Sequence, residues 1–346
     1  MLRHSSDSEP GYTRKKIGAA WGYFDGDKRV TDRAEIDRLN ALALPPAYVD
    51  AWFCKDANGH IQATGKDARG RKQYRYHVDF RAKKDASKYD LIREFGEALP
   101  KLRARVAKDL KKRTIERDAV LAAVVRLLDT EHMRIGNEQY ARANKSFGLS
   151  TLRSRHVRRT GGKLRMRYTG KHGIVHEATI TDASLKRIVA KCQELPGQML
   201  FQYVGDDGEP HPISSADVND YIRDASGGDF TAKHFRTWGA SVIFFEQLLG
   251  SATSERRTLK TVLEPVAEAL GNTPTMSRKS YVHPCLIDAL QEDARDPLHG
   301  MKRPRARRRL SSAETGFLKF LKKKPRRSRR RAKAANDDAK AGKRAA

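Results

Sequence analysis

The chain has 346 residues, and its 70 Lys and Arg against 42 Asp and Glu give a formal net charge of +28. This length allows about two domains, and no apolar run reaches the roughly 18 residues that a membrane span needs. The three cysteines, Cys54, Cys192 and Cys285, are scattered and form neither a disulfide framework nor a metal-ligand pair. We therefore expect a reducing, intracellular compartment, and we expect no secretory signal because the N-terminus lacks an apolar core. The positive charge indicates an anionic partner, above all nucleic acid.

Much of this charge lies at the C-terminus. Residues 302–346 contain 19 Lys and Arg against 3 Asp and Glu, whereas residues 1–301 contain 51 against 39. Blocks of like charge repel one another and are usually disordered when free. We expect residues 299–346 to form a disordered basic tail that binds phosphate backbones without sequence preference. The rest of the chain is also basic, so a nucleic-acid partner is expected even without the tail.

Short strands and turns are predicted for the first part of the chain. The pattern predicts a hairpin at residues 21–31, a helix at 32–44 that ends at two prolines, and a second hairpin at 49–64. Residues 1–12 show no such pattern and are expected to be a loose terminus. Residues 1–85 are therefore predicted to form a small β-rich module.

From about residue 86 apolar residues recur every three or four positions, which is the helical period. Residues 86–298 are therefore predicted to form a larger, mainly helical domain that contains a three-stranded antiparallel sheet, so the predicted fold class is α+β. The sheet is expected at residues 155–180, and a short last helix is expected to contain Tyr281. The other helices are expected at 91–110, 118–129, 182–194, 216–225, 231–249 and 258–270.

Five residues in separate stretches have complementary chemistry. Arg134 follows the 118–129 helix, Lys171 lies at a turn of the sheet, Arg236 lies on the 231–249 helix, and Asn272 precedes Tyr281 by nine residues. A phenol has an unperturbed pKa near ~10, so a tyrosine that attacks another group needs positive charge around it. Each residue alone is more often a surface or packing residue. Together they have the chemistry required for phosphoryl transfer from a nucleic-acid backbone.

The motifs around these residues resemble those of the type IB DNA topoisomerases, in particular the compact bacterial and poxvirus-type members. The resemblance covers residues 20–295 and rests on the order of six stretches. These are RGRKQYRYH at 69–77, RIGNEQY at 134–140, GLSTLR at 148–153, YTGK at 168–171, KHFRTWG at 233–239, and GNTP at 271–274 followed by Tyr281.

The resemblance implies a reaction for this chain. Tyr281 would attack one strand of duplex DNA, form a 3′-phosphotyrosyl link and leave a free 5′-hydroxyl. Strand rotation would then relax positive and negative supercoils before religation without ATP or metal. Arg134 and Arg236 would bind the non-bridging phosphate oxygens, and Lys171 would be the general acid. Asn272 stands where many relatives have histidine, and it can donate a hydrogen bond but cannot titrate.

The resemblance also implies DNA contacts outside this group. Strand alternation places Tyr74 and Tyr76 on one face, and the alternative is that both pack in the module's own core. The module 1–85 and the domain 86–298 would close around the duplex as a clamp. The expected partner is duplex DNA, with no membrane and no cofactor, and the expected state is a cytoplasmic, nucleoid-associated monomer. The expected DNA-binding residues are Lys233, Gln73, Tyr74, Tyr76, Arg69, Arg71, Lys72 and Tyr140.

Two other functions compete with this interpretation. A tyrosine recombinase uses a related set of residues but usually has histidine three residues before the second arginine, where this chain has Lys233, and Gly-His where it has Gly271-Asn272. A non-enzymatic architectural protein would account for the charge but would leave Tyr281 and its partners unexplained.

Overall fold

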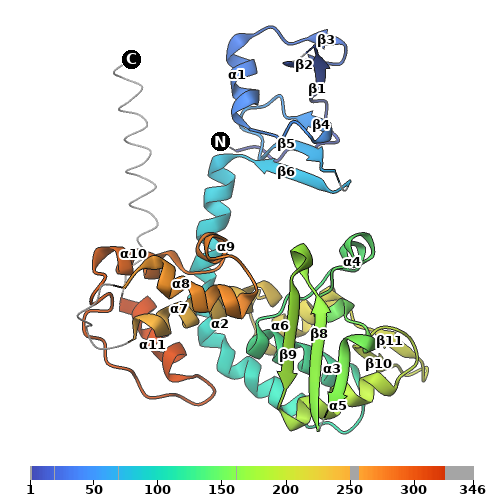
Figure 1. Cartoon of the computed structure of the whole chain (residues 1–346), viewed down its shortest axis with the longest axis vertical. Coiled ribbons are helices and arrows are strands. Elements are labelled where there is room, and N and C mark those ends of the chain that lie inside the picture. Colours follow the sequence, from blue (N-terminus) through green and yellow to red (C-terminus); the bar gives the residue numbers. More distant parts are fainter. Residues whose placement is uncertain (1, 19, 69, 161, 250–256, 324–346) are drawn as a thin grey trace. The chain divides into compact units, whose positions relative to one another are not determined.

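The computed structural model describes residues 2–323 except 19, 69, 161 and 250–256. Contacts within the chain divide it into two compact units, Met1–Tyr89 and Asp90–Ala346. The division falls inside α2 (Val78–Asp109), a long helix that contributes to both units (Figure 1). The sequence predicts the boundary between residues 85 and 86. The helix α2 already begins at Val78. Its first residues are largely polar, so the apolar spacing on which the prediction rests did not reveal them.

The first unit is built on a six-stranded antiparallel sheet with the order β3-β2-β1-β4-β5-β6. Tyr23, Leu39 and Phe53 lie in its core. The Asp32 side chain accepts a hydrogen bond from the backbone N of Ala34 and so begins the predicted helix. Both predicted hairpins are present. The elements are β1 (Tyr12–Ile17), β2 (Ala20–Asp25), β3 (Lys28–Arg29), α1 (Arg33–Ala41), β4 (Val49–Phe53), β5 (Ile61–Lys66) and β6 (Lys72–Tyr76).

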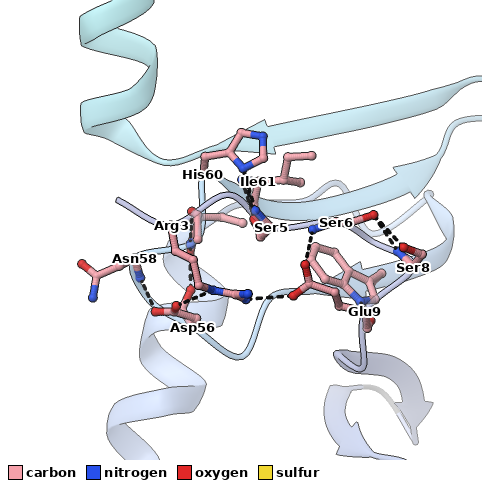
Figure 2. Close-up of polar contacts among 12 residues, drawn as sticks. Arg3, Ser5, Ser6, Ser8, Glu9, Asp56, Asn58, His60 and Ile61 are labelled. Carbon is pink, nitrogen blue, oxygen red and sulfur yellow. Dashed lines mark hydrogen bonds and ion pairs between the residues drawn. The ribbon is translucent and has the colours of Figure 1, made fainter. Parts of the chain in front are cut away.

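The N-terminal segment is bound to this unit by polar contacts (Figure 2). The backbone N of Arg3 donates to the carbonyl oxygen of Asn58 at 2.9 Å, and its guanidinium pairs with Asp56 at 3.0 Å. Ser5 is 3% exposed, and its backbone N donates to Nδ1 of His60 at 2.9 Å. The expectation of a loose terminus is therefore wrong for this segment. Polar groups rather than apolar ones hold it, so no hydrophobic pattern indicated the contact.

The second unit has a largely buried helix, α3 (Arg117–Glu131). In α3 residues 119–125, 127 and 128 are all buried, because other helices and strands pack around the helix. The predicted three-stranded sheet is present with the order β7-β8-β9. The other elements are α4 (Glu138–Asn144), β7 (Val157–Thr160), β8 (Lys163–Thr169), β9 (Val175–Ile180), α5 (Ala183–Glu194), β10 (Gln202–Val204), β11 (Pro210–Pro212), α6 (Ser215–Ser226), α7 (Ala232–Leu248), α8 (Leu259–Leu270), α9 (Pro274–Ser280) and α10 (Pro284–Glu292).

The expected tail is folded over part of its length. Residues Ser312–Lys323 form helix α11, which packs on α7 and has Phe317 completely buried. Glu314 on the same helix accepts hydrogen bonds from Trp238 Nε1 at 3.0 Å and from Arg103 Nη2 at 2.7 Å. The expectation of disorder from residue 299 is therefore wrong through Lys323, because apolar residues at helical spacing outweigh the local charge. The rest of the predicted tail, 324–346, lies outside the described residues.

A pair of substitutions in α11 tests this docking. We expect Phe317→Ala to lower the free energy of unfolding by about 3–5 kcal/mol, because it removes a buried aromatic side chain and leaves a cavity. Lys319→Ala in the same helix changes an exposed residue and is expected to have an effect within about 0.5 kcal/mol. Urea unfolding followed by circular dichroism measures both. Equal effects of the two substitutions would show that α11 does not dock.

Candidate active site

Tyr281 lies directly after α9, where its backbone N caps the helix by donating to the carbonyl oxygen of Ser277 at 3.0 Å. Ser241 of α7 is fully buried beside it. The Ser241 Oγ accepts from the backbone N of His283 at 3.0 Å. Its single proton has two acceptors within reach, the carbonyl oxygen of Thr237 at 2.7 Å and that of Tyr281 at 3.3 Å. The backbone that follows Tyr281 is therefore fixed to α7, and the backbone N of Tyr281 itself is bonded to α9. The predicted short helix is present, but Tyr281 follows its last residue.

Arg236 is held at the ends of two helices. It is only 5% exposed, and its Nη1 donates to the carbonyl oxygen of His132, the residue that ends α3. Its Nη2 donates at 2.9 Å to the carbonyl oxygen of Leu270, the last residue of α8. The guanidinium carbon lies 5.0 Å from the centre of the Tyr281 ring. Unbonded carbonyls at helix C-termini have partial negative charge and so stabilise this buried cation.

Arg134 and Asn272 complete the group around the tyrosine. Arg134 Nη2 donates to Asn272 Oδ1 at 2.6 Å, and the backbone N of Asn272 donates to Ala267 of α8 at 2.9 Å. Three buried donor atoms of this group have no hydrogen-bond partner among the described residues, and they are Arg134 Nη1, Arg236 Nε and Asn272 Nδ2. Buried donors normally have partners. Two cations and an amide with unused donors therefore form a site suited to an anion.

These cations change the acidity of Tyr281. Burial alone raises the pKa of this phenol, but the charges and hydrogen bonds of Arg236 and Arg134 outweigh burial and leave the pKa below the ordinary 10.0. The pKa of Arg236 is lowered in turn, first by burial and then by the charge of Arg134. Arg278 and Lys279 adjoin Tyr281 in sequence but are exposed. The positive charge expected around the tyrosine therefore comes from distant parts of the chain.

Two residues of the sheet lie within electrostatic reach of the same arginines. Burial raises the pKa of Tyr168 to about 12, although Arg236 and Arg134 oppose the shift, so this second tyrosine stays protonated. Its ring stacks at 5.3 Å on His176, whose pKa is lowered by burial and by both arginines. His176 was not predicted as a site residue. No motif marks it, and strand pairing with Tyr168 is the signal that links it to the site.

The hydrogen bonds, ring contacts and charges described above do not include the other predicted residues of this unit. Lys171 is exposed in the turn Lys171–Gly173 between β8 and β9. Lys233 is exposed in the first turn of α7, whereas Arg236 three residues later is buried. Tyr140 is half-buried in α4, where its backbone N donates to Asn137 Oδ1 at 2.9 Å. Arg134, Arg236, Asn272 and Tyr281 are thus the four predicted residues that the fold brings together.

In the first unit Tyr74 and Tyr76 lie on the same face of β6. Their rings stack at 5.9 Å with an interplanar angle of 11°, and they are 41% and 46% exposed. The structure therefore excludes the alternative that both tyrosines pack in the core of the module. Two exposed aromatic rings on one strand can stack on bases or pack against a sugar–phosphate backbone.

The polar side chains predicted to contact DNA beside these tyrosines are paired with carboxylates. Lys72 forms an ion pair with Asp7 of the N-terminal segment. Arg71 pairs with Asp67 at 2.7 Å, and Gln73 Nε2 donates to the same carboxylate at 3.0 Å. Lys72, Arg71 and Gln73 thus already have carboxylate partners within the unit. The remaining predicted residue, Arg69, lies outside the described residues.

Residues 2–323, apart from the gaps named above, contain neither a cluster of metal ligands nor a helix that could span a membrane. In that part of the chain no three His, Cys, Asp or Glu side chains are placed to hold a metal ion. No helix there has both the length and the apolar character needed to cross a bilayer.

The chain is similar to known proteins over both units. Residues 77–303 match the family model described as the catalytic core of eukaryotic DNA topoisomerase I, and residues 20–67 match that of the N-terminal domain of bacterial DNA topoisomerase IB. DNA topoisomerase 1B of Acanthamoeba polyphaga mimivirus is 33% identical over 82% of this chain and 88% of its own length. DNA topoisomerase 1B of vaccinia virus (strain Copenhagen) is 20% identical over 71% of this chain and 76% of its own.

A tyrosine among guanidinium groups with unused donors, on a mainly helical unit, has the chemistry of an enzyme that acts on an anionic substrate, and the matches specify the family. The chain belongs to the type IB DNA topoisomerases. It is therefore an isomerase that changes the topology of DNA, and its N-terminal domain is of the bacterial type.

The lowered pKa of Tyr281 can be measured by ultraviolet titration of tyrosinate. We expect a component that ionises below pH 10 in the wild type and is missing in Tyr281→Phe. In Arg134→Ala this component should shift to higher pH, because a positive charge that favours the phenolate is removed. Tyr168→Phe is the matched control, since the pKa of Tyr168 is raised. If Tyr168→Phe instead lost the component that ionises below pH 10, that component would not belong to Tyr281.

Proposed function

We propose that Tyr281 nicks one strand of duplex DNA by forming a 3′-phosphotyrosyl ester, that strand rotation then relaxes positive and negative supercoils, and that the nick is resealed without ATP or metal. The tyrosine oxygen forms a bond to phosphorus while the bond from phosphorus to the 5′-oxygen breaks. The phenol proton is lost and the 5′-oxygen gains a proton. The ester conserves the energy of the broken bond, so religation is the reverse reaction.

The observation that supports this proposal most is the set of unused donors around Tyr281. Negative charge grows on the non-bridging oxygens as the phosphorus becomes five-coordinate. Arg134, Arg236 and Asn272 each have a buried donor without a partner among the described residues. A phosphate there would accept these donors, and a guanidinium keeps its charge and donates in a fixed plane. Loss of one preorganised donor typically costs about 10²–10³ in rate.

Lys171 is proposed as the general acid for the leaving 5′-oxygen. An alkoxide is a poor leaving group, so proton transfer to it contributes about 10²–10⁴ in rate. Lysine has three donors on a flexible stem, and an exposed turn leaves it accessible to bound DNA. Asn272, which does not titrate, is proposed to bind phosphate by hydrogen bonds alone.

The DNA contacts proposed outside the catalytic group use charge and stacking. Tyr74 and Tyr76 offer exposed rings, and Lys233 and Tyr140 lie near the catalytic residues in the sequence motifs. Arg69, Arg71, Lys72 and Gln73 are proposed to bind the phosphate backbone. One chain contains all five proposed catalytic residues, so we propose that it acts as a monomer on the DNA of the nucleoid.

Relaxation of supercoiled plasmid in EDTA without ATP tests the reaction. We expect the wild type to relax both superhelical signs, Tyr281→Phe to bind DNA without relaxing it, and Tyr203→Phe on β10 to remain active. A covalent complex with a 5′-end-labelled strand should form only when Tyr281 is present. A Tyr281→Phe protein that still relaxes plasmid would exclude this nucleophile, and an architectural protein would alter topology with or without it.

A second experiment tests the DNA face of the first unit. Asp7→Asn removes the carboxylate that pairs with Lys72, so Lys72 becomes free to neutralise a phosphate. We expect tighter binding to duplex DNA and a slope of log K against log salt that is steeper by about 0.9.

Glu9→Gln is the matched control for Asp7→Asn. It removes one negative charge from the same segment, but Glu9 pairs with Arg3, which is not a proposed DNA contact. The control should leave the salt slope unchanged. Equal slopes for the two variants would show that only net charge matters and that Lys72 does not contact phosphate.

A further inference from the structure

His176 on β9 lies between two turns that approach it closely. A Cβ added to Gly170 would lie 2.5 Å from His176 Cδ2 and 2.8 Å from Nε2. A Cβ added to Gly271, whose φ is +56°, would collide with His176 Cε1. Both turns therefore approach the imidazole more closely than any other residue type allows. Gly170 immediately precedes Lys171, and Gly271 immediately precedes Asn272.

The shape of the ring holds it in this place. Its flat face stacks on the neighbouring strand residue Tyr168 at 5.3 Å and 17°. Within the described part of the chain, no hydrogen bond is made by either ring nitrogen of His176. Burial, Arg134 and Arg236 all keep the pKa of His176 below its ordinary 6.5, so the ring is neutral at neutral pH and adds no charge to the site.

Lys171 depends on its backbone for its position. Its side chain is exposed and makes no hydrogen bond or ion pair with any described residue. Its turn is closed by the backbone N of Gly170, which donates to Ile174 at 2.7 Å, and by that of Gly173, which donates to Gly170 at 3.1 Å. A turn closed by these hydrogen bonds is a rigid unit. Any contact that fixes the position of Gly170 therefore also fixes the Cα of Lys171, from which its side chain extends.

We propose that His176 is a positioning residue that sets the spacing between the Lys171 turn and the Asn272 turn, and thereby places the Lys171 ammonium at the leaving 5′-oxygen. This inference rests on the proposed function and assigns a role to a residue outside the catalytic set. The imidazole acts as a spacer of fixed thickness between the general acid and the phosphate-binding residues. It neither touches DNA nor transfers a proton.

The experiment compares two DNA substrates that differ at one atom. In the first the leaving atom is the ordinary 5′-oxygen, and in the second a 5′-bridging phosphorothiolate has sulfur there. A thiolate leaves without a proton, so loss of a general acid affects only the ordinary substrate. We expect His176→Ala to slow single-turnover cleavage of ordinary DNA by about 10²-fold and of the phosphorothiolate by less than about threefold.

Other variants define this pattern. Lys171→Ala should behave like His176→Ala, whereas Asn272→Ala should be slow on both substrates because the phosphate contact is needed for either. His176→Phe keeps a flat ring of similar thickness and should recover most of the rate. His211→Ala removes a half-buried imidazole from β11 and should change neither rate. Gly170→Ala pushes on the ring from the turn and should reproduce the selective loss even if His176→Ala folds poorly.

Two results would overturn the proposal. Equal slowing of both substrates by His176→Ala, in a protein of unchanged melting temperature, would mean that His176 does not act through the general acid. Unchanged rates on both would mean that it positions nothing. Failure of the wild type to form a covalent complex with either substrate would instead refute the proposed function itself.

Discussion

The buried guanidinium of Arg236 is the constraint on which the site depends. A charge removed from water is costly unless it is paired and hydrogen-bonded. Here the partners are the carbonyl oxygens of His132 and Leu270, at the ends of α3 and α8. Carbonyl groups at helix ends neutralise only part of a full charge. The remainder acts on the phenol of Tyr281, so an incompletely neutralised arginine gives a more acidic tyrosine.

Helix α7 joins this arginine to the rest of the unit. Within three turns it holds Arg236 in the site, Trp238 against α11, and Ser241 against the backbone of Tyr281. Trp238 bonds to Glu314, which Arg103 also binds, and Arg103 pairs in addition with Asp129 near the end of α3 at 2.7 Å. The C-terminal helix, which the sequence indicates as disordered tail, is thus coupled to α7, which contains Arg236, and through Arg103 to α3, whose end binds Arg236.

The sequence predicts the elements that have strong periodicity and the residues that have unusual chemistry. The hairpins, the sheet around Lys171 and the helix with Arg236 follow from apolar spacing and turn residues. Prediction from the sequence fails where polar contacts determine the structure. Ser5 and its neighbours are held by hydrogen bonds, which leave no periodic pattern. The many charges around Phe317 led to a prediction of disorder where the structure has a helix. His176 is linked to the site by strand pairing and by two close glycines, and these contacts exist only in the folded backbone.

The attachment of Tyr281 has a mechanical consequence. Its carbonyl oxygen lies 3.3 Å from the Oγ of Ser241, and that Oγ accepts a hydrogen bond from the backbone N of His283 at 3.0 Å. Ser241 itself is fully buried in α7. In the proposed intermediate this residue holds one end of the broken strand, and no covalent bond holds the other end. Torque stored in the DNA would therefore turn the unattached end about an anchor that the core keeps rigid. The protein would then stay fixed while the DNA rotates. Friction on the rotating DNA end, rather than motion of the protein, would govern how fast supercoils are released.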